Sequence, residues 1–482
     1  MTSSLPLGWT VALIDEVSYE VRSGFASGNK NAYGGVSHLR MNNIGVRGEL
    51  VLDTVRAVPP NLAKPNYFLE PGDVIVCTTN STKLVGKCAF FDLVGRYAFS
   101  NHLTRLRPLS RLVDGKFLRW NLWVLWRSGA FEEKCKHWVN QSTLPKEELL
   151  NTPVLVPPLP EQRRIVAKLE KLLDKVDSCQ KRLAKIPVLL KRFRQAVLTA
   201  ACSGRLTEDW REENGAAGSS TVRDASGSLL DESDFPNGWH ITNLGALAKL
   251  VTSGSRGWAK YYAESGAIFI RAQNINSDIL DLEEPAYVQL PQSCEGVRTK
   301  VQLQDILVTI TGANVTKSAL VQTHIEDAYV SQHVALLRLK DVRVSEFVFL
   351  SLLSPMHGRR QLRSLAYGQG KPGLNLDNIR SVVLALPPLV EQNEIVRRVK
   401  QLFALADQIE ARYEKAKEYV DNLKQSILAK AFRGELVPQD PNDEPATALL
   451  ERISGNSRDP ASESPRRRAN NSGSSQKQLH FP

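Results

Sequence analysis

One phrase occurs twice in this chain, and the repeat constrains the fold more than any other feature. Residues 156–166 have the sequence VPPLPEQRRIV, and residues 386–396 have the sequence LPPLVEQNEIV. Further matches fall at the same offset near the start and end of each half. The pairs include Pro6 and Pro236, Gly8 and Gly238, Trp9 and Trp239, Glu161 and Glu391, Gln162 and Gln392, Gly204 and Gly434, and Leu206 and Leu436. This self-similarity indicates two copies of one structural unit.

The middle parts of the two halves correspond less closely. Gly72-Asp73-Val74-Ile75-Val76 resembles Gln304-Asp305-Ile306-Leu307-Val308, and both fragments have the composition of short strands bounded by polar turns. Each half also contains one amphipathic helix candidate, over Phe117–Trp138 and Ser345–Leu365. These patterns predict an α+β domain in each half. A shared frame with different middles suits two modules that do one kind of job on two different targets.

A long helix is expected after each copy of the phrase. Apolar residues recur there at alternating steps of three and four, the roughly 3.5-residue period of a coiled-coil seam. The seam residues are Ile165, Leu169, Leu172, Val176, Leu183, Leu190, Ile395, Val399, Leu402, Ile409, Val420 and Leu423. The matched length and register favour antiparallel pairing of the two helices with each other. In the alternative, each helix packs on its own domain or on another protein.

The ends of these helices carry recognisable signals. Prolines precede Glu161 and Glu391, and an early Glu suits the positive end of a helix dipole. Gly204 and Gly434 are placed to end the helices in the left-handed conformation. Pro187 falls inside the first helix, where it removes a hydrogen bond, so we expect a kink there. The second helix has Lys417 at the matching position and should lack this kink.

The predicted fold class is therefore α+β. Two similar α/β domains are separated by an antiparallel coiled coil of two long helices, with a pseudo-two-fold internal repeat. The expected order is a first domain at 1–155, a first long helix at 156–206, a linker at 207–235, a second domain at 236–385, a second long helix at 386–436, and a C-terminal extension at 437–482 that is mostly disordered after about residue 453.

Composition and motifs limit the function classes. Lys and Arg number 62 against 51 Asp and Glu, which gives a net charge of +11 and permits a polyanionic partner. The six cysteines show no CxxC pairing, and no GxxxxGK with a following Ser or Thr, GxSxG or HExxH motif occurs. We therefore predict no catalytic residues, no metal site and no cofactor in this chain. No apolar run approaches about 18 residues and no secretory leader is evident, so we expect a cytoplasmic protein without a membrane segment.

Two variable domains, each followed by PPLxEQxxIV and a long helix that ends in a Gly-x-Leu phrase, resemble the specificity subunit of type I restriction-modification systems. The resemblance covers nearly the whole chain to about Leu450. It implies two target recognition domains that recognise the halves of a bipartite, asymmetric double-stranded DNA site, with the helices as spacer and dock. The implied partners are two modification (methyltransferase) subunits, which carry S-adenosylmethionine and methylate adenine, and restriction subunits, ATP-dependent translocases and endonucleases that use ATP and Mg²⁺. The chain lacks the NPP tetrapeptide, ending in Tyr or Phe, of adenine methyltransferases, which fits this division of labour.

Given this resemblance, polar and basic loops are the candidates for DNA contact. Arg, Lys, Asn and Gln suit guanine and adenine edges, and Tyr or Trp can support a displaced base. The candidates in the first domain are Lys30, Asn31, Tyr33, Thr79, Asn80, Lys83, Asn101 and His102, beside the loop Gln141-Ser142-Thr143. Those in the second domain are Arg256, Trp258, Lys260, Tyr261, Asn314, Lys317, Gln332, His333, Gln369 and Lys371. Arg40 and Arg271 match in position, which argues for a shared structural or phosphate role rather than base specificity.

Two other function classes stay open at this point. A non-catalytic coiled-coil scaffold would use its two domains to bind protein partners, and changes at Lys30 or Arg256 would then leave DNA affinity and its salt dependence unaltered. An unrecognised enzyme acting alone would show activity in the purified single chain.

Overall fold

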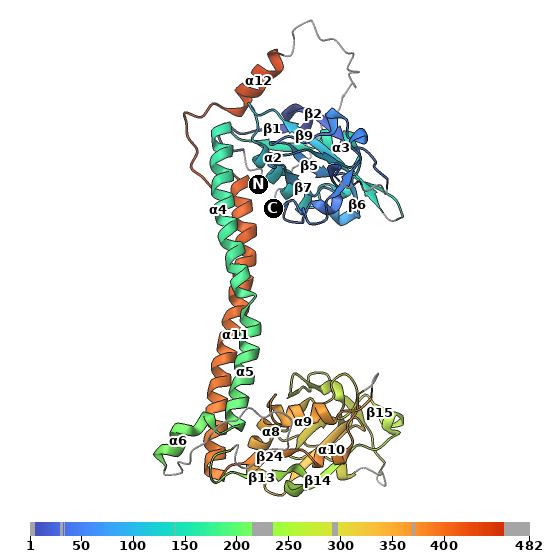
Figure 1. Cartoon of the computed structure of the whole chain (residues 1–482), viewed down its shortest axis with the longest axis vertical. Coiled ribbons are helices and arrows are strands. Elements are labelled where there is room, and N and C mark those ends of the chain that lie inside the picture. Colours follow the sequence, from blue (N-terminus) through green and yellow to red (C-terminus); the bar gives the residue numbers. More distant parts are fainter. Residues whose placement is uncertain are drawn as a thin grey trace. The chain divides into compact units, whose positions relative to one another are not determined.

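The computed structural model describes residues 5–28, 32, 34–139, 141–214, 235–291, 297–368 and 372–456. The chain forms two compact units, one of residues Met1–Arg182 with Ala416–Pro482 and the other of Leu183–Lys415. Each unit contains one globular domain and a stretch of helix pair (Figure 1). The two units are described in turn.

The first domain is built around a four-stranded antiparallel sheet in the order β2-β9-β5-β7. A smaller sheet, β4-β3-β8, contains one parallel pair, and β1 pairs with β12 at the base of the domain. The strands are β1 Thr10–Leu13, β2 Ser18–Ser23, β3 Val36–Leu39, β4 Arg56–Val58, β5 Val74–Cys77, β6 Thr79–Asn80, β7 Cys88–Phe90, β8 Tyr97–Phe99, β9 Leu103–Pro108, β10 Lys136–His137, β11 Ser142–Thr143 and β12 Pro153–Val156. The helices are α1 Ile14–Val17, α2 Gly115–Arg127 and α3 Lys146–Leu150.

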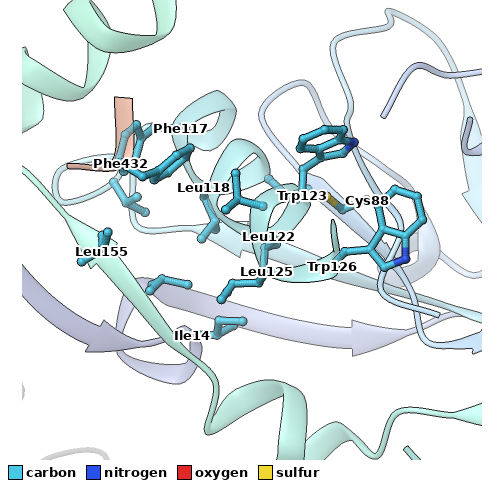
Figure 2. Packing of buried hydrophobic residues seen from close by; sticks show 14 of the residues in the cluster. Ile14, Cys88, Phe117, Leu118, Leu122, Trp123, Leu125, Trp126, Leu155 and Phe432 are labelled. Carbon is cyan, nitrogen blue, oxygen red and sulfur yellow. The ribbon is translucent and has the colours of Figure 1, made fainter. Parts of the chain in front are cut away.

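Helix α2 covers one side of this sheet and forms much of the core. Its N-terminus is capped by Asp114, whose carboxylate accepts hydrogen bonds from the backbone N–H groups of Lys116 and Phe117. Figure 2 shows Phe117, Leu118, Leu122 and Leu125 of α2 together in the buried cluster, with Ile14 and Leu155 close by. Phe432 from the far end of the chain packs on Phe117 with ring centroids 5.7 Å apart. The C-terminal end of the second long helix is thus part of the first domain's core.

The second domain repeats this plan. Its main sheet has the order β14-β23-β20-β21, a second sheet has the order β15-β19-β16-β22, and β13 pairs with β24 at the base. The strands are β13 His240–Asn243, β14 Ala248–Ser253, β15 Tyr262–Ala263, β16 Ala267–Ile270, β17 Ile275–Asn276, β18 Ile279–Leu280, β19 Ala286–Val288, β20 Ile306–Thr309, β21 Ser318–Leu320, β22 Ala328–Val330, β23 Val334–Leu339 and β24 Val383–Leu386. The helices are α7 Leu244–Leu247, α8 Ser345–Leu353, α9 Gly358–Leu365 and α10 Leu376–Arg380. The predicted strands at 74–76 and 306–308 are confirmed.

The repeated phrase anchors each domain to its long helix. The indole N–H of Trp9 donates to Glu161 at 3.1 Å, and that of Trp239 donates to Glu391 at 2.9 Å, and all four side chains are buried. The surroundings of the two carboxylates differ. Glu391 also accepts hydrogen bonds from Arg211 and Thr207, whereas one oxygen of Glu161 has no hydrogen-bond partner. Burial accordingly raises the pKa of Glu161.

The long helices pair antiparallel in each unit, as predicted. They are α4 Leu159–Leu183, α5 Ile186–Cys202 and α11 Leu389–Phe432. In the first unit Asp177 lies 3.5 Å from Lys424, and Gln180 donates to Asp421 at 2.8 Å. Residue numbers rise along one helix as they fall along the other, so the helices run in opposite directions. In the second unit Arg194 of α5 forms an ion pair with Asp407 of α11 at 2.6 Å.

Most seam residues pack as the heptad pattern predicts. Ile165, Leu169, Val176, Leu190, Ile395 and Val399 are buried, and Leu172, Leu183, Leu402, Val420 and Leu423 are half-buried. Ile409 is the most exposed of the predicted seam residues, at 40 %. It lies between Asp407 and Glu410, which both pair with Arg194, so ion pairs occupy the contact there.

The structure corrects the predicted helices. The first long helix is interrupted between α4 and α5, where Pro187 stands in the first turn of α5, so the expected kink is a break. The helix predicted over 117–138 ends at Arg127, because Gly129 takes a left-handed conformation with φ +82°. The helix predicted over 345–365 is two helices, since Pro355 interrupts it.

The predicted linker and C-terminal extension also contain helices. Helix α6, Glu208–Glu213, lies within the expected linker, and its Arg211 is buried in an ion pair with Glu391 at 2.5 Å. Helix α12, Ala446–Asn456, lies within the extension, and the backbone N–H of Ala446 donates to Gly8 at 2.9 Å. The remaining linker, 215–234, and the tail from 457 lie outside the described residues.

Gly204 and Gly434 adopt left-handed conformations with φ +79° and +74°, as predicted. Gly204 packs on Pro236 and Gly434 packs on Pro6. The end of each long helix therefore packs on the start of the domain in its own unit, and the C-terminal region returns to the N-terminal domain.

Candidate nucleic-acid interface

In the first domain, loops predicted to contact DNA meet at one edge of the sheet. The backbone N–H groups of Thr78 and Thr79 donate to His102 at 2.9 and 3.2 Å, because β5 and β9 are neighbouring strands. Thr79 pairs in register with Thr143, and the N–H of Asn101 donates to Phe25, just before the loop that begins at Ser27. We call this meeting of segments the loop edge.

The second domain has the same loop edge. The N–H of Ile310 donates to His333 at 2.9 Å, as β20 and β23 pair like β5 and β9. Thr311 forms a bridge with Gly373, and the N–H of Gly254 donates to Ser331 at 3.2 Å. Segments far apart in sequence thus converge in the same way in both domains, although their side chains differ.

The candidate residues vary in exposure. Lys83, Asn101, Arg256, Lys260 and Gln332 are exposed, and Thr79, Asn80, His102, Tyr261, Asn314, Lys317 and His333 are half-buried. Lys30, Asn31, Tyr33, Gln369 and Lys371 lie outside the described residues. Some half-buried candidates already have partners in the domain: Asn314 donates to Ala272 at 3.2 Å and Lys317 lies 3.7 Å from Asp278.

Trp258 requires a correction. We expected an aromatic side chain available in a loop, but its indole is only 4 % exposed. It stacks on Phe269, with ring centroids 5.6 Å apart, and contacts Tyr329 edge-on. The indole therefore packs against residues of the second sheet of this domain and is not available to stack on a base.

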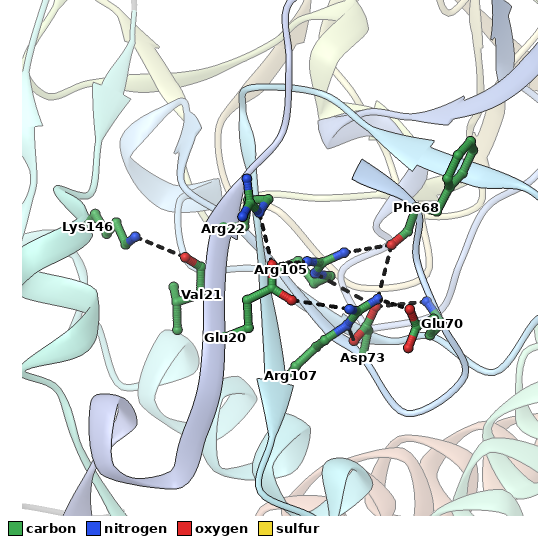
Figure 3. Close-up of polar contacts among 9 residues, drawn as sticks. All are labelled: Glu20, Val21, Arg22, Phe68, Glu70, Asp73, Arg105, Arg107 and Lys146. Atoms are coloured by element: carbon green, nitrogen blue, oxygen red, sulfur yellow. Dashed lines mark hydrogen bonds and ion pairs between the residues drawn. The ribbon is translucent and has the colours of Figure 1, made fainter. Parts of the chain in front are cut away.

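Figure 3 shows an ionic network in the first domain, which the strand registers place at the end of the main sheet away from the loop edge. Glu20 accepts hydrogen bonds from Arg105 at 2.6 Å and from Arg107 at 3.2 Å, and Arg107 also donates to Asp73 at 3.0 Å. Burial opposes ionisation of Glu20, but the neighbouring guanidinium groups, including that of Arg22, lower its pKa. Burial dominates at Asp73 and raises its pKa. The network ties together β2, β5 and β9.

The second domain keeps half of this network. Arg338 donates to both oxygens of Asp305, at 2.8 and 2.7 Å, and these residues correspond to Arg107 and Asp73. The strand registers place Leu250 and Leu336 where the first domain has Glu20 and Arg105. A buried charged pair in one copy is thus a pair of leucines in the other.

Arg40 and Arg271 occupy matching positions at the ends of β3 and β16. In each case the backbone N–H donates to an asparagine three residues on, Asn43 at 2.9 Å or Asn274 at 3.0 Å. The Nε atom of each arginine is buried without a hydrogen-bond partner. The backbone N–H of Ser100 donates to Leu39, the last residue of β3, and that of Ser331 donates to Ile270, the last residue of β16. Arg40 and Arg271 come directly after these residues, so both arginines border the loop edges.

The sequence prediction included Gln141, Ser142 and Thr143 but missed the other side of the β10–β11 hairpin, which carries Lys136, His137 and Trp138. The signal was present in the sequence: a polar stretch, KHWVNQST, with one large aromatic residue. It was hidden because the predicted helix extended to Trp138.

Among the described residues, no group of three or more His, Cys, Asp or Glu side chains is placed to hold a metal ion. Within the same part of the chain, no helix is both long and apolar enough to cross a bilayer.

The fold and the two loop edges define a class of protein, an internally duplicated chain in which two α+β domains are mounted on an antiparallel helix pair. The model of the type I restriction modification DNA specificity domain matches residues 8–188 and 236–418. The chain belongs to this family and is a type I specificity subunit with two target recognition domains, so the resemblance noted from sequence is confirmed.

Relatives of known class agree over nearly the full length. The chain is 30 % identical over 469 residues to the EcoKI specificity subunit of Escherichia coli strain K12, covering 93 % of this chain and 95 % of that one. It is 32 % identical over 469 residues to the StySPI specificity subunit of Salmonella potsdam, with the same coverage.

The fold is also similar to solved structures. The crystal structure of the HsdS subunit from Thermoanaerobacter tengcongensis matches with a TM-score of 0.57 at 21 % identity, covering 90 % of this chain and 99 % of that one. A chain from a structural study of complex assembly and conformational transition in a type I restriction-modification system matches with a TM-score of 0.63 at 21 % identity, covering 90 % of this chain and all of that one.

Proposed function

We propose that each domain recognises one half of a bipartite, asymmetric DNA sequence through its loop edge, and that the chain itself is not catalytic. The observation that carries this is the repeated loop edge: one backbone arrangement presents Asn101 and His102 in the first domain and Gln332 and His333 in the second. Phosphate contacts would position each edge, and hydrogen bonds to base edges in the major groove would specify the sequence. Different side chains on one frame give different half-sites.

The proposed partners follow from membership of the family. Two modification subunits would dock on this chain, bring S-adenosylmethionine and methylate an adenine in each half-site. Restriction subunits would bring ATP and Mg²⁺, translocate the DNA and cleave it. We propose that the long helices act as the spacer between the half-sites and that the complex works in the cytoplasm.

The test is methylome sequencing of cells that carry this chain with its modification subunits. We expect one bipartite motif with two different halves and an unspecified gap. Asn101→Ala should relax the first half alone and Gln332→Ala the second half alone, because a good base-edge contact discriminates by about 1–3 kcal/mol. A continuous motif, or a change of both halves by either variant, contradicts the proposal.

A second experiment separates the spacer from the recognition domains. Insertion of one heptad into both long helices should change the tolerated gap and leave both half-site sequences intact. A changed half-site with an unchanged gap would reverse these roles. A scaffold for protein partners would instead leave DNA affinity and its salt dependence unaltered in Lys83→Ala and Arg256→Ala variants.

A further inference from the structure

The β10–β11 hairpin of the first domain has a rigid stem at the loop edge. Lys136 pairs with Thr143 and His137 with Ser142, and β11 pairs in turn with β6. The hydroxyl of Ser142 lies 2.7 Å from that of Thr82 and 2.9 Å from Nδ1 of His137. These contacts fix the stem to the segment that carries Thr79 and Asn80.

The tip of this hairpin exposes two large apolar residues. The N–H of Trp138 donates to Gln141 at 2.8 Å and closes the turn, which leaves Trp138 70 % exposed and Val139 100 % exposed. The chain has eight tryptophans, all within its described part, and Trp138 is the only one whose side chain is mostly exposed. An exposed indole does not contribute the stability that a buried one would, so the exposure of both side chains indicates that a binding partner covers the tip.

The chemistry of the hairpin selects the kind of occupant. Residues 136–143 include a lysine and a histidine but no carboxylate, and Lys83, also exposed, lies three residues after the end of β6. A two-stranded ribbon fits the major groove of B-DNA. In other DNA-binding proteins, those that bind the minor groove, apolar side chains insert between base steps. If the tip bound a groove on a protein, we would expect the residues around Trp138 to be mainly apolar, whereas they are basic and polar.

On the proposed DNA-recognition function, we propose that Trp138 inserts at a base step of the half-site recognised by the first domain and stacks on the base there. Val139 beside it provides an apolar contact for a neighbouring base edge. Trp138 is thus a specificity-determining residue of this domain, because the cost of opening a base step depends on its sequence.

The second domain shows why this contact belongs to one half-site. Tyr367 forms a bridge with Gly373, which in turn forms a bridge with Thr311, so Tyr367 has the register of Lys136 and not that of Trp138. Tyr367 is 60 % exposed, but it lies in the paired position that Lys136 occupies in the first domain. The two domains therefore place their exposed aromatic residues differently.

The experiment uses the full chain assembled with its modification subunits and a duplex that carries the methylated motif, with 2-aminopurine placed in turn along the first half-site. We expect Trp138→Ala to weaken binding to this duplex roughly 5- to 150-fold, the range for loss of one aromatic stack on a base. Trp138→Phe should retain most of the affinity. The fluorescence change of 2-aminopurine at one position should be lost in Trp138→Ala and kept in Trp138→Phe.

The matched control is Tyr19→Ala, which removes another exposed aromatic side chain, 63 % exposed, from the opposite end of β2 in the same domain. It should bind DNA like the wild type. Equal DNA binding by Trp138→Ala and Tyr19→Ala overturns the proposal, as does a loss confined to assembly with the modification subunits, which would make the tip a protein contact. If the wild-type complex itself shows no preference for a bipartite duplex, the proposed function fails as well, so the two failures are distinguishable.

Discussion

The buried pair of Glu20 and Arg105 provides a quantitative test of how the first domain is stabilised. Arg105 has a fully buried side chain that donates to Glu20 and, at 2.6 Å, to the backbone oxygen of Phe68. Glu20→Leu removes the carboxylate that accepts a hydrogen bond from this guanidinium and leaves Asp73, 3.9 Å from Nε, as its remaining counter-charge. Removal of one partner of a buried pair costs about 3–5 kcal/mol. Since Glu20 is 27 % exposed, we expect the first domain to lose about 3 kcal/mol of stability, the low end of this range.

The double variant Glu20→Leu/Arg105→Leu copies the second domain, which has Leu250 and Leu336 at these positions. We expect its stability to lie within about 1 kcal/mol of the wild type, because replacement of a whole buried pair by packed apolar side chains is often neutral. The coupling between the two substitutions should therefore be at least about 2 kcal/mol, and larger by whatever Arg105→Leu costs alone. As a control, Glu70→Leu removes the outer carboxylate that pairs with Arg107 and is 64 % exposed, and should cost under about 1 kcal/mol.

Hydrogen exchange measured peptide by peptide suits this two-unit chain better than one unfolding curve. Peptides from β5 and β9 report on the first domain, and peptides from β20 and β23 in the same sample provide an unchanged reference. Protection of β5 and β9 should fall in Glu20→Leu and return in the double variant. If the double variant is as unprotected as Glu20→Leu, the two leucines do not replace the ion pair and the reasoning is refuted.

Three further predictions use matched residues or the titration of one buried group. Trp9→Phe should destabilise its unit by about 1–3 kcal/mol, more than Trp239→Phe does in the other unit. Glu161 then loses its hydrogen bond from Trp9, whereas Glu391 keeps those from Arg211 and Thr207. Urea denaturation followed by hydrogen exchange in each unit measures both losses, and the reverse order would contradict this prediction. Burial lowers the pKa of His357 to about 4, so the folded state holds it neutral, and the second unit should lose up to about 3 kcal/mol as the pH falls from about 6.5 towards 4; in exchange measurements His357→Asn should show a flatter pH profile. Arg40→Gln and Arg271→Gln should each weaken binding to specific and nonspecific DNA alike and reduce the salt slope by about 1, as expected for a phosphate contact, with an unaltered methylation motif; a changed motif would instead assign base recognition to them.

Sequence periodicity predicted the features that depend on local pattern. The heptads of the long helices, the glycine ends at Gly204 and Gly434, and the strands at 74–76 and 306–308 all follow from spacing and backbone preference within a short window. The antiparallel pairing followed from the matched length of the two helices. The sequence identified the loops as candidates but did not show that they meet at one edge, because this depends on which strands are neighbours in the sheet.

Features that depend on distant partners were missed. Arg211 lies in a polar, acidic stretch, and only its pairing with Glu391 makes α6 an ordered element. Trp258 looked like a loop residue because its stacking partner, Phe269, lies on a strand that begins after it. The same limit applies to Trp138, whose exposure depends on how the chain folds around it and not on its neighbours in sequence. The bases recognised by either edge are set by such long-range geometry as well.

The return of the C-terminal segment has a consequence for damaged versions of this chain. Phe432, Gly434 and Ala446 complete the packing beneath the first domain, and none of them belongs to the unit that holds the second. A premature stop codon shortly after Lys415 would therefore harm the domain that was translated first and spare the one nearest the lesion. The position of such a stop codon in the gene would suggest a defect in the second domain. The loss of activity would in fact come from the first domain.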